Sequence, residues 1–178
     1  AYAWGNWSTT WGDSGLNTVN LNTNFINNIG RTWSDKIIEH KWITGGMDIY
    51  TRKAEIQTTF KSEIASPASG STYTAKIGLM YVSDYGYAAA PSAWTTVLYR
   101  YDNSDVSAVN WMYKGNLEWT ITVYLSGSHI TYAYYLDGAV DSTEIPDYHY
   151  SVRPTFYLNS DVTYISGDGT MSSPILLS

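Results

Sequence analysis

Apolar residues recur every three or four positions between residues 16 and 29, and this spacing predicts an amphipathic helix. Ser14 is the expected N-cap, because a serine oxygen accepts a hydrogen bond from a free backbone N–H of the first turn. Gly30 is the expected end, because glycine commonly follows the last helical residue. The apolar positions are Leu16, Val19, Leu21, Phe25, Ile26 and Ile29.

Two apolar stretches farther along the chain predict strands. Residues 35–46 predict a strand that ends in a Gly-Gly turn, and residues 75–91 predict a strand that runs into a short second helix, stopped by a proline. The residues between these stretches, 47–75, are polar and irregular. Within them we expect an exposed loop at residues 65–71.

Strand-like patterns dominate the C-terminal third of the chain. Asp137 and Gly138 predict a hairpin turn, because Asp-Gly between two alternating segments is typical of a two-residue turn. Residues 166–170 predict a second tight turn. The expected strands are residues 115–125, 130–136, 139–145, 152–159 and 162–165.

The order of these elements predicts a mixed α+β fold. A chain of 178 residues is long enough to bury a substantial core without disulfides or metals. No internal repeat or break in composition divides it. We therefore expect a single domain spanning residues 1–178.

Several residues are expected to build the scaffold of this domain. Trp111, Trp119 and Phe156 are the large apolar side chains that we assign to the core. Arg153 precedes a proline, and we expect it to hold the entrance of a strand by pairing with a buried acid or with backbone carbonyls. Asp168 is expected to be a turn residue, because the acidic loop of a calcium site is absent.

Residues 123–151 differ in composition from the rest of the chain. They hold six tyrosines, two histidines and four acids, and no Lys, Arg, Asn, Gln, Met or Trp. The tyrosines at 132, 134, 135, 148 and 150 fit either a half-buried sheet or a solvent-facing contact patch. On a strand, the first two would share one face and the third would face the other way. We favour the contact patch, because the neighbouring residues are small or polar, and antibody binding loops use the same mixture.

Charge and composition exclude several classes of partner. The net charge is −6, and residues 123–151 contribute four acids with no basic residue to offset them. No Lys/Arg cluster is present to bind phosphates, so we expect no nucleic-acid partner. The absence of cysteine removes disulfides and thiolate sites, and we expect no metal and no cofactor. No apolar run has membrane-spanning length, so we expect no membrane insertion by this chain and an anchor that lies outside it.

Motifs for catalysis are weak. His40 is expected to be an exposed strand histidine, and His129 and His149 lack the spacing of a metal site. No GxSxG motif anchors a hydrolase triad. Asp141 and Glu144 could form a carboxylate pair, but acids on a hairpin arm are usually solvated. We therefore expect that the protein is not an enzyme.

Five segments resemble a group of bacterial surface-protein domains with the C-type lectin fold. Some members of this group are the variable proteins of diversity-generating retroelements, and many form the distal part of secreted, lipid-anchored or type IV pilin-like proteins. The resemblance implies two helices packed on a twisted, mainly antiparallel β-sheet. The segments are SGLNTVNLNTNFINNI, HKWITGG, AKIGLMYVSDYGYAA, NWMYKGNLEWTIT and SVRPTFYLNSDVTYISGDGT.

The resemblance also implies which residues contact a ligand. In such systems adenine-directed mutagenesis rewrites selected codons, typically Asn codons, and the accessible residues exclude Lys, Gln, Glu, Met and Trp. Residues 123–151 fit this set everywhere except Glu144. The candidate variable contacts are Tyr124, Leu125, Ser126, His129, Ile130, Tyr132, Tyr134, Tyr135, Ala139, Asp141, Ser142, Tyr148, His149 and Tyr150.

The sequence departs from calcium-dependent lectins. Residues 144–147, Glu-Ile-Pro-Asp, only loosely match their sugar-binding motif, and no Trp-Asn-Asp run is present. We therefore carry over neither calcium nor monosaccharide binding. The expected function is non-catalytic binding of an extracellular protein or glycan at the bacterial cell surface, as an adhesin or pilus-tip-like domain. An aromatic carbohydrate-binding module is the alternative, and an enzyme of the formylglycine-generating type is the least favoured.

Overall fold

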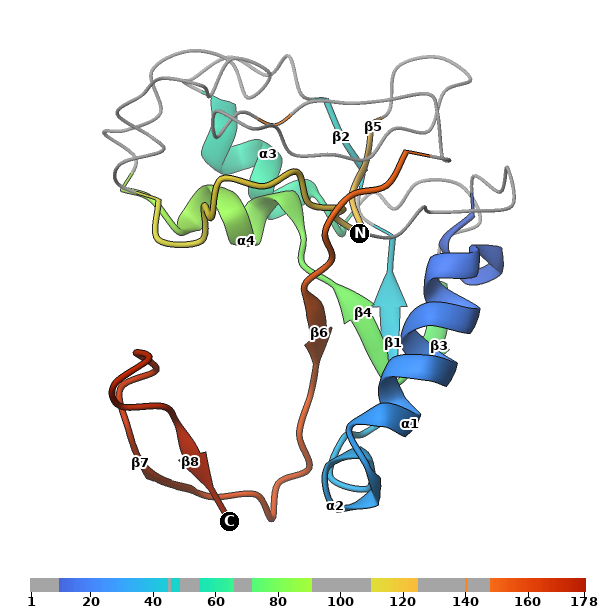
Figure 1. Cartoon of the computed structure of the whole chain (residues 1–178). Helices are drawn as coiled ribbons and strands as arrows, with labels where there is room; N and C mark the ends of the chain where they lie inside the picture. The colour runs from blue at the N-terminus through green and yellow to red at the C-terminus, as the bar shows by residue number, and fades with distance from the viewer. Residues whose placement is uncertain are drawn as a thin grey trace.

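Short helices and short paired strands make up the described part of the chain, which comprises residues 10–44, 46–48, 55–65, 72–90, 110–124, 140 and 148–178. Figure 1 shows this computed structural model. The helical elements are η1 (Trp11–Asp13), η2 (Leu16–Phe25), α1 (Ile26–Asn28), α2 (Arg31–Ser34), α3 (Ile56–Ser62) and α4 (Val82–Tyr87). The strands are β1 (His40–Ile43), β2 (Gly46–Met47), β3 (Thr72–Ala75), β4 (Ile77–Leu79), β5 (Val123–Tyr124), β6 (Pro154–Phe156), β7 (Tyr164–Ser166) and β8 (Leu176–Leu177). The fold is mixed α+β, as the sequence predicts.

The N-terminal helix is confirmed and consists of η2 followed by α1. Ser14 Oγ accepts a hydrogen bond from the Asn17 N–H at 3.1 Å, which is the expected capping contact. At the other end Gly30 adopts φ 78°, a left-handed conformation that glycine tolerates without strain. Most of the helix has π-helical bonding. The Asn20 and Asn22 amides each donate to the carbonyl five residues earlier, so side chains that are poor helix formers help to satisfy this backbone.

One of these asparagines also attaches the helix to the strands. Asn22 Nδ2 donates to the Ile77 carbonyl and Asn22 Oδ1 accepts from the Ile77 N–H, both at 2.9 Å. The amide therefore bonds to β4 as a neighbouring strand would. Figure 1 shows the helix alongside β3, β1 and β4.

The described strands form four two-stranded units. β1 pairs with β3, β4 with β6 and β7 with β8, all antiparallel, whereas β2 and β5 are parallel. Antiparallel pairing thus predominates among the described residues, as expected. The strands at β4, β6 and β7 and the short helix α4 lie where the sequence predicts them.

Three segments differ from the sequence-based expectations. Residues 47–75 are not irregular throughout, because they contain α3 and β3, and Gly46 belongs to β2 rather than to a turn. Residues 115–125 do not form one strand: in their described part only Val123–Tyr124 is a strand, and Glu118 makes an isolated bridge with Ser151. Residues 118–123 are instead buried consecutively, so the alternation of a half-exposed strand is absent. β8 was also not foreseen.

Part of the second half lies outside the described residues. This includes the predicted hairpin at residues 130–145, apart from Val140, and most of the loop at residues 65–71. The tight turn at residues 166–170 is confirmed. There the Thr170 N–H donates to Asp168 Oδ1 at 3.0 Å, which makes Asp168 a turn residue, as expected.

Two groups of buried side chains form the core. The larger one includes Trp42, Ile77 and Trp119, beneath the N-terminal helix. The smaller one gathers Phe60, Tyr85 and their neighbours around α3 and α4. The Trp42 ring lies against Gly78, where an added Cβ would approach the ring to 2.5 Å, so glycine is required for this packing.

The assignment of three aromatic residues to the core is correct for only one of them. Trp119 is buried, with 0% of its surface exposed. Trp111 is 69% exposed, because the turn that carries it directs Asn110 and Met112 inward and the indole outward. Phe156 is also exposed, at the end of β6, where the strand presents its ring to solvent.

The C-terminal hairpin β7–β8 extends away from the rest of the described chain (Figure 1). No side chain of this hairpin belongs to either core group. Its larger apolar side chains are therefore exposed, among them Tyr164, Ile165, Met171 and Leu176.

We predict that Trp119→Ala lowers the free energy of unfolding by about 3–5 kcal/mol, because the truncation leaves a cavity in the larger core group. Trp33→Ala is the matched control, since Trp33 is exposed on α2, and it should change stability by less than about 0.5 kcal/mol. Urea denaturation followed by circular dichroism measures both values. Equal losses for the two variants would contradict the assignment of Trp119 to the core.

Candidate ligand-binding site

The Tyr-rich segment, residues 123–151, begins and ends on the same part of the core. At its start, β5 pairs with β2, and Val123 is buried. At its end, the Ser151 N–H donates to the Leu117 carbonyl at 2.8 Å, and the Trp119 N–H donates to the Ser151 carbonyl at 3.0 Å. The residues that precede the segment therefore also hold its last residue.

An aromatic ladder leads from the core to the surface at the end of this segment. The Tyr150 ring is half-buried and lies 4.5 Å, between centroids, from the Trp119 ring. The Tyr148 ring lies 6.0 Å from that of Tyr150 and is 46% exposed. His149, the residue between these two tyrosines in the sequence, is exposed. Tyr148 and His149 thus face solvent, whereas Tyr150 fits the half-buried interpretation better than the solvent-facing one.

The other candidate contacts have little or no described structure. Tyr124 forms the last residue of β5, where its backbone pairs with Met47. The candidates that lie outside the described residues are Leu125, Ser126, His129, Ile130, Tyr132, Tyr134, Tyr135, Ala139, Asp141 and Ser142.

Val140 lies within this segment but belongs to the core. Its side chain is 1% exposed and packs in the group that contains Met47, Phe60 and Met80. The segment is therefore not purely a surface feature, in contrast to the expectation from its composition. Val140 is absent from the candidate contacts, although the residues on either side of it are among them.

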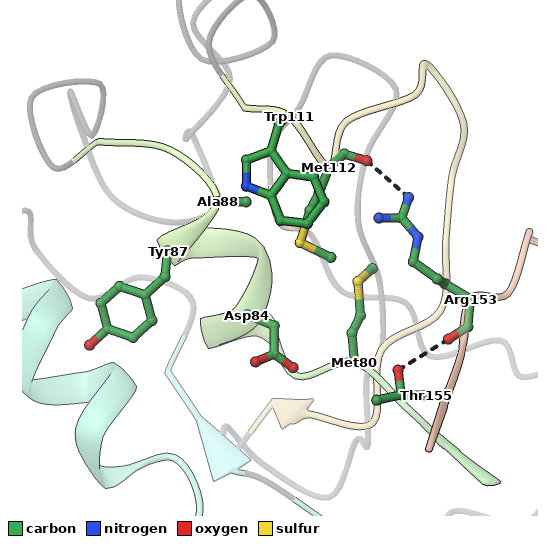
Figure 2. Close-up of a pocket in the computed structure, with 8 residues that line it drawn as sticks. All are labelled: Met80, Asp84, Tyr87, Ala88, Trp111, Met112, Arg153 and Thr155. Atoms are coloured by element: carbon green, nitrogen blue, oxygen red, sulfur yellow. Dashed lines mark hydrogen bonds between the residues drawn. The ribbon is translucent and has the colours of Figure 1, made fainter. Parts of the chain in front are cut away.

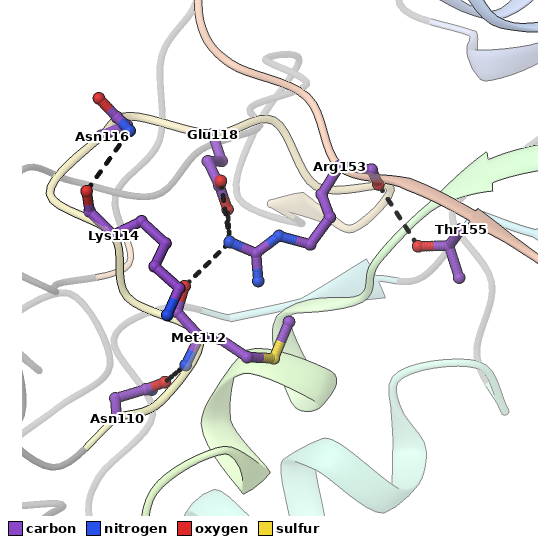
Figure 3. Close-up of polar contacts among 7 residues, drawn as sticks. All are labelled: Asn110, Met112, Lys114, Asn116, Glu118, Arg153 and Thr155. Atoms are coloured by element: carbon purple, nitrogen blue, oxygen red, sulfur yellow. Dashed lines mark hydrogen bonds and ion pairs between the residues drawn. The ribbon is translucent and has the colours of Figure 1, made fainter. Parts of the chain in front are cut away.

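Arg153 holds the chain directly after the segment, as the sequence predicts. Its Nη2 lies 2.9 Å from both carboxylate oxygens of Glu118 and donates to the Met112 carbonyl, also at 2.9 Å (Figure 3). Glu118 is almost fully buried. Arg153 therefore pairs with a buried acid and with a backbone carbonyl, the two kinds of partner that the sequence analysis left open.

An open cleft of about 440 Å³ lies next to Arg153 (Figure 2). Residues at and before α4 form one side, the turn with Trp111 and Met112 forms another, and Arg153 and Thr155 complete it. Sequence reasoning missed this cleft because it assigned Trp111 to the core. The exposed Lys114 and Gly115 soon after Trp111 were the available signal of a surface turn, whereas the polar Asn110 before it is buried.

Glu63 is a buried carboxyl group that sequence reasoning also missed. Its oxygens accept hydrogen bonds from the Ser83 N–H at 3.1 Å and from the Thr122 hydroxyl, and Thr122 Oγ1 accepts from the Val82 N–H at 3.0 Å. Burial raises the pKa of Glu63 above its ordinary value, against the lowering effect of its hydrogen bonds to Ser83 and Thr122. Since Glu63 is 0% exposed, its role is to join α3, α4 and the approach to β5.

The histidines do not assemble a reaction centre in the described residues. His40 lies on β1 and is half-buried rather than exposed, because its ring packs 4.2 Å from Tyr157 and 5.1 Å from Trp42. Within the described ranges, no three His, Asp or Glu side chains gather as they would around a metal ion. No helix found there has the length and apolar character needed to span a membrane.

Comparisons of the chain with protein-family models, with curated proteins and with solved structures found no match.

We predict that Glu63→Gln removes a pH dependence of stability. A raised folded-state pKa means that the contribution of Glu63 is fully present below its ordinary pKa of 4.5 and is lost as the pH rises through the raised value. The stability of the wild type relative to Glu63→Gln should therefore increase as the pH falls from 8 to about 5. Urea denaturation at a series of pH values measures this difference, in which other titrating groups cancel. A constant difference across the range would contradict the prediction.

Proposed function

We propose that the protein is a non-catalytic, extracellular ligand-binding domain with a C-type-lectin-like fold, whose Tyr-rich segment of residues 123–151 forms a diversified binding surface. Within this proposal it acts as an adhesin-like distal part of a bacterial surface or type IV pilin-like protein, and the segment varies by retroelement-directed mutagenesis. The observation that carries the proposal is that the last residue of the segment is hydrogen-bonded to Leu117 and Trp119, which lie shortly before the segment begins at β5.

This attachment suits a surface that changes in sequence. The contacts at the end of the segment are backbone hydrogen bonds of Ser151 with Leu117 and Trp119. Because they join backbone groups, they depend little on which side chains the segment carries. A fixed base also limits the conformational entropy lost on binding, because the ends are already ordered. Substitutions of exposed residues such as Tyr148 and His149 can then alter recognition and leave the fold intact. The buried Val140 and the half-buried Tyr150, in contrast, are part of the fold.

The exposed aromatic residues supply the recognition chemistry. Tyr148 presents a large amphipathic ring with few rotatable bonds, supported from below by Tyr150. Such rings contribute contact area at low entropic cost, and His149 adds an adaptable polar group. Together with the Tyr-rich composition of the segment, this supports protein or glycan recognition better than catalysis.

The same exposed ring also suits an aromatic carbohydrate-binding module, in which Tyr148 would stack on a sugar. A glycan array separates the two proposals. Graded binding to one polysaccharide class would favour the carbohydrate-binding module, whereas binding to individual proteins or to unrelated glycans would favour the diversified surface.

We predict that Tyr148→Ser leaves the melting temperature nearly unchanged but alters ligand binding, because the ring is about half exposed at the end of the ladder. Tyr150→Ser is the matched comparison and should destabilise the fold by about 1–3 kcal/mol, since that ring packs on Trp119. Thermal unfolding and array binding of both variants provide the test. A large loss of stability from Tyr148→Ser would show that Tyr148 belongs to the core, and the binding-surface proposal would then fail.

The encoding locus offers an independent test of the variation. We expect a nearby reverse transcriptase gene and a near-copy of the DNA for residues 123–151 that differs from it only at adenines. Sequencing the locus in several isolates would then reveal differences at the candidate codons and identity in the codons for residues 117–122. A locus without such a copy would contradict the proposal that the segment varies by retroelement-directed mutagenesis. It would not bear on ligand binding, which the glycan array tests separately.

A further inference from the structure

We infer that the cleft beside α4 is a second binding site, and that it takes an organic ammonium ion such as a lysine side chain or a trimethylammonium group. This site lies outside the Tyr-rich segment, so it goes beyond the proposed function and does not depend on it. Its lining comes from residues 80–88, from the turn with Trp111 and Met112, and from Arg153 and Thr155.

An exposed indole forms one wall of the cleft. Trp111 is exposed and borders the cleft. The volume of the cleft, about 440 Å³, lies within the usual range for small-molecule sites, roughly 300–1,000 Å³. In Figure 2 its ring lies over the side chain of Met112, with Met80 farther in. Tyr87 points away from these residues, toward α3, where it contacts Phe60. Trp111 is therefore the aromatic face that remains for a ligand, and tryptophan is the ring that binds cations best.

The methionine side chains complete an apolar and polarisable floor. Met80 and Met112 both line the cleft and are otherwise buried, at 2% and 8% exposed. Such a surface can contact the methyl or methylene groups that surround an ammonium nitrogen. A small inorganic cation would gain nothing from it.

The lining carries one carboxylate, Asp84, and one cation, Arg153, whose charge is paired with Glu118 outside the lining. Asp84 Oδ2 accepts a hydrogen bond from the Tyr81 N–H at 2.8 Å, and among the described residues no hydrogen bond to Oδ1 is found. The positive charge of Arg153 is compensated by Glu118, 2.9 Å away. No ion pair to Asp84 is found in the described part of the chain, so Asp84 contributes a negative charge to the cleft, in a chain whose net charge is −6. An acidic protein also raises the local concentration of cations.

An anion would fit this cleft poorly. Arg153 Nη2 is engaged with Glu118 and the Met112 carbonyl, and the Thr155 hydroxyl donates to the Arg153 carbonyl at 3.4 Å. Figure 2 shows the bond of Arg153 to the Met112 carbonyl and that of Thr155 to the Arg153 carbonyl. An anion would have to share the guanidinium charge with Glu118 and would face repulsion from Asp84.

The charge of the ligand is tested with a pair of compounds of equal shape. Choline chloride and its neutral isostere 3,3-dimethyl-1-butanol are titrated into the full 178-residue chain, with binding followed by chemical shifts of the indole N–H signals. We expect choline to bind about tenfold more tightly than the isostere, because the cation–π and carboxylate contacts require the charge. Nα-acetyl-lysine methylamide, in parallel, distinguishes a peptide lysine from a trimethylammonium group. Equal binding of choline and its isostere, or preferred binding of inorganic phosphate or a methyl glycoside, would overturn the inference.

Variants locate the site. Trp111→Ala and Asp84→Asn should each weaken choline binding about tenfold, and the asparagine retains an acceptor for the Tyr81 N–H. Trp33→Ala on α2 and Tyr148→Ser should leave choline binding unchanged, which separates this site from the proposed binding surface. Circular dichroism confirms that each variant is folded. Unchanged affinity in both Trp111→Ala and Asp84→Asn would overturn the assignment of the cleft.

Discussion

The consecutive burial of residues 118–123 is the constraint on which the rest of the arrangement depends. Trp119 fills the larger core group, and its backbone N–H holds the Ser151 carbonyl. Thr122 reaches Glu63 beneath α4, and Val123 begins the pairing with β2. One short run of chain thereby fixes both ends of the Tyr-rich segment and the start of a helix that borders the cleft. A shift of this run would displace all three.

The two proposed binding regions differ in how they are built on this base. The surface around Tyr148 and His149 is linked to the core by the ring of Tyr150, which lies between Tyr148 and Trp119. The cleft depends on residues that are themselves structural: Met80 and Met112 are buried, and Arg153 joins two segments. The first region can change in sequence at little structural cost, whereas most changes in the second would also affect the fold.

The sequence was sufficient where a local pattern determines the structure. Apolar spacing and the Ser14 and Gly30 signals located the N-terminal helix, and the position of Arg153 before a proline indicated its pairing. It was insufficient where tertiary contacts decide. The polar stretch IQTTFKS forms α3 because Phe60 packs into the core, and Trp111 faces outward because Asn110 bonds within the turn. Composition likewise identified the Tyr-rich segment but could not separate the buried Val140 and half-buried Tyr150 from exposed Tyr148.

The attachment of the N-terminal helix by Asn22 has a chemical consequence. Its side chain must donate to one backbone group of Ile77 and accept from another, which only an uncharged amide does at this position. Deamidation would keep the acceptor but turn the donor into a second carboxylate oxygen facing the Ile77 carbonyl. Deamidation of this one side chain would therefore weaken the attachment of the helix to the strands. The protein contains no cysteine, so no disulfide holds these elements together.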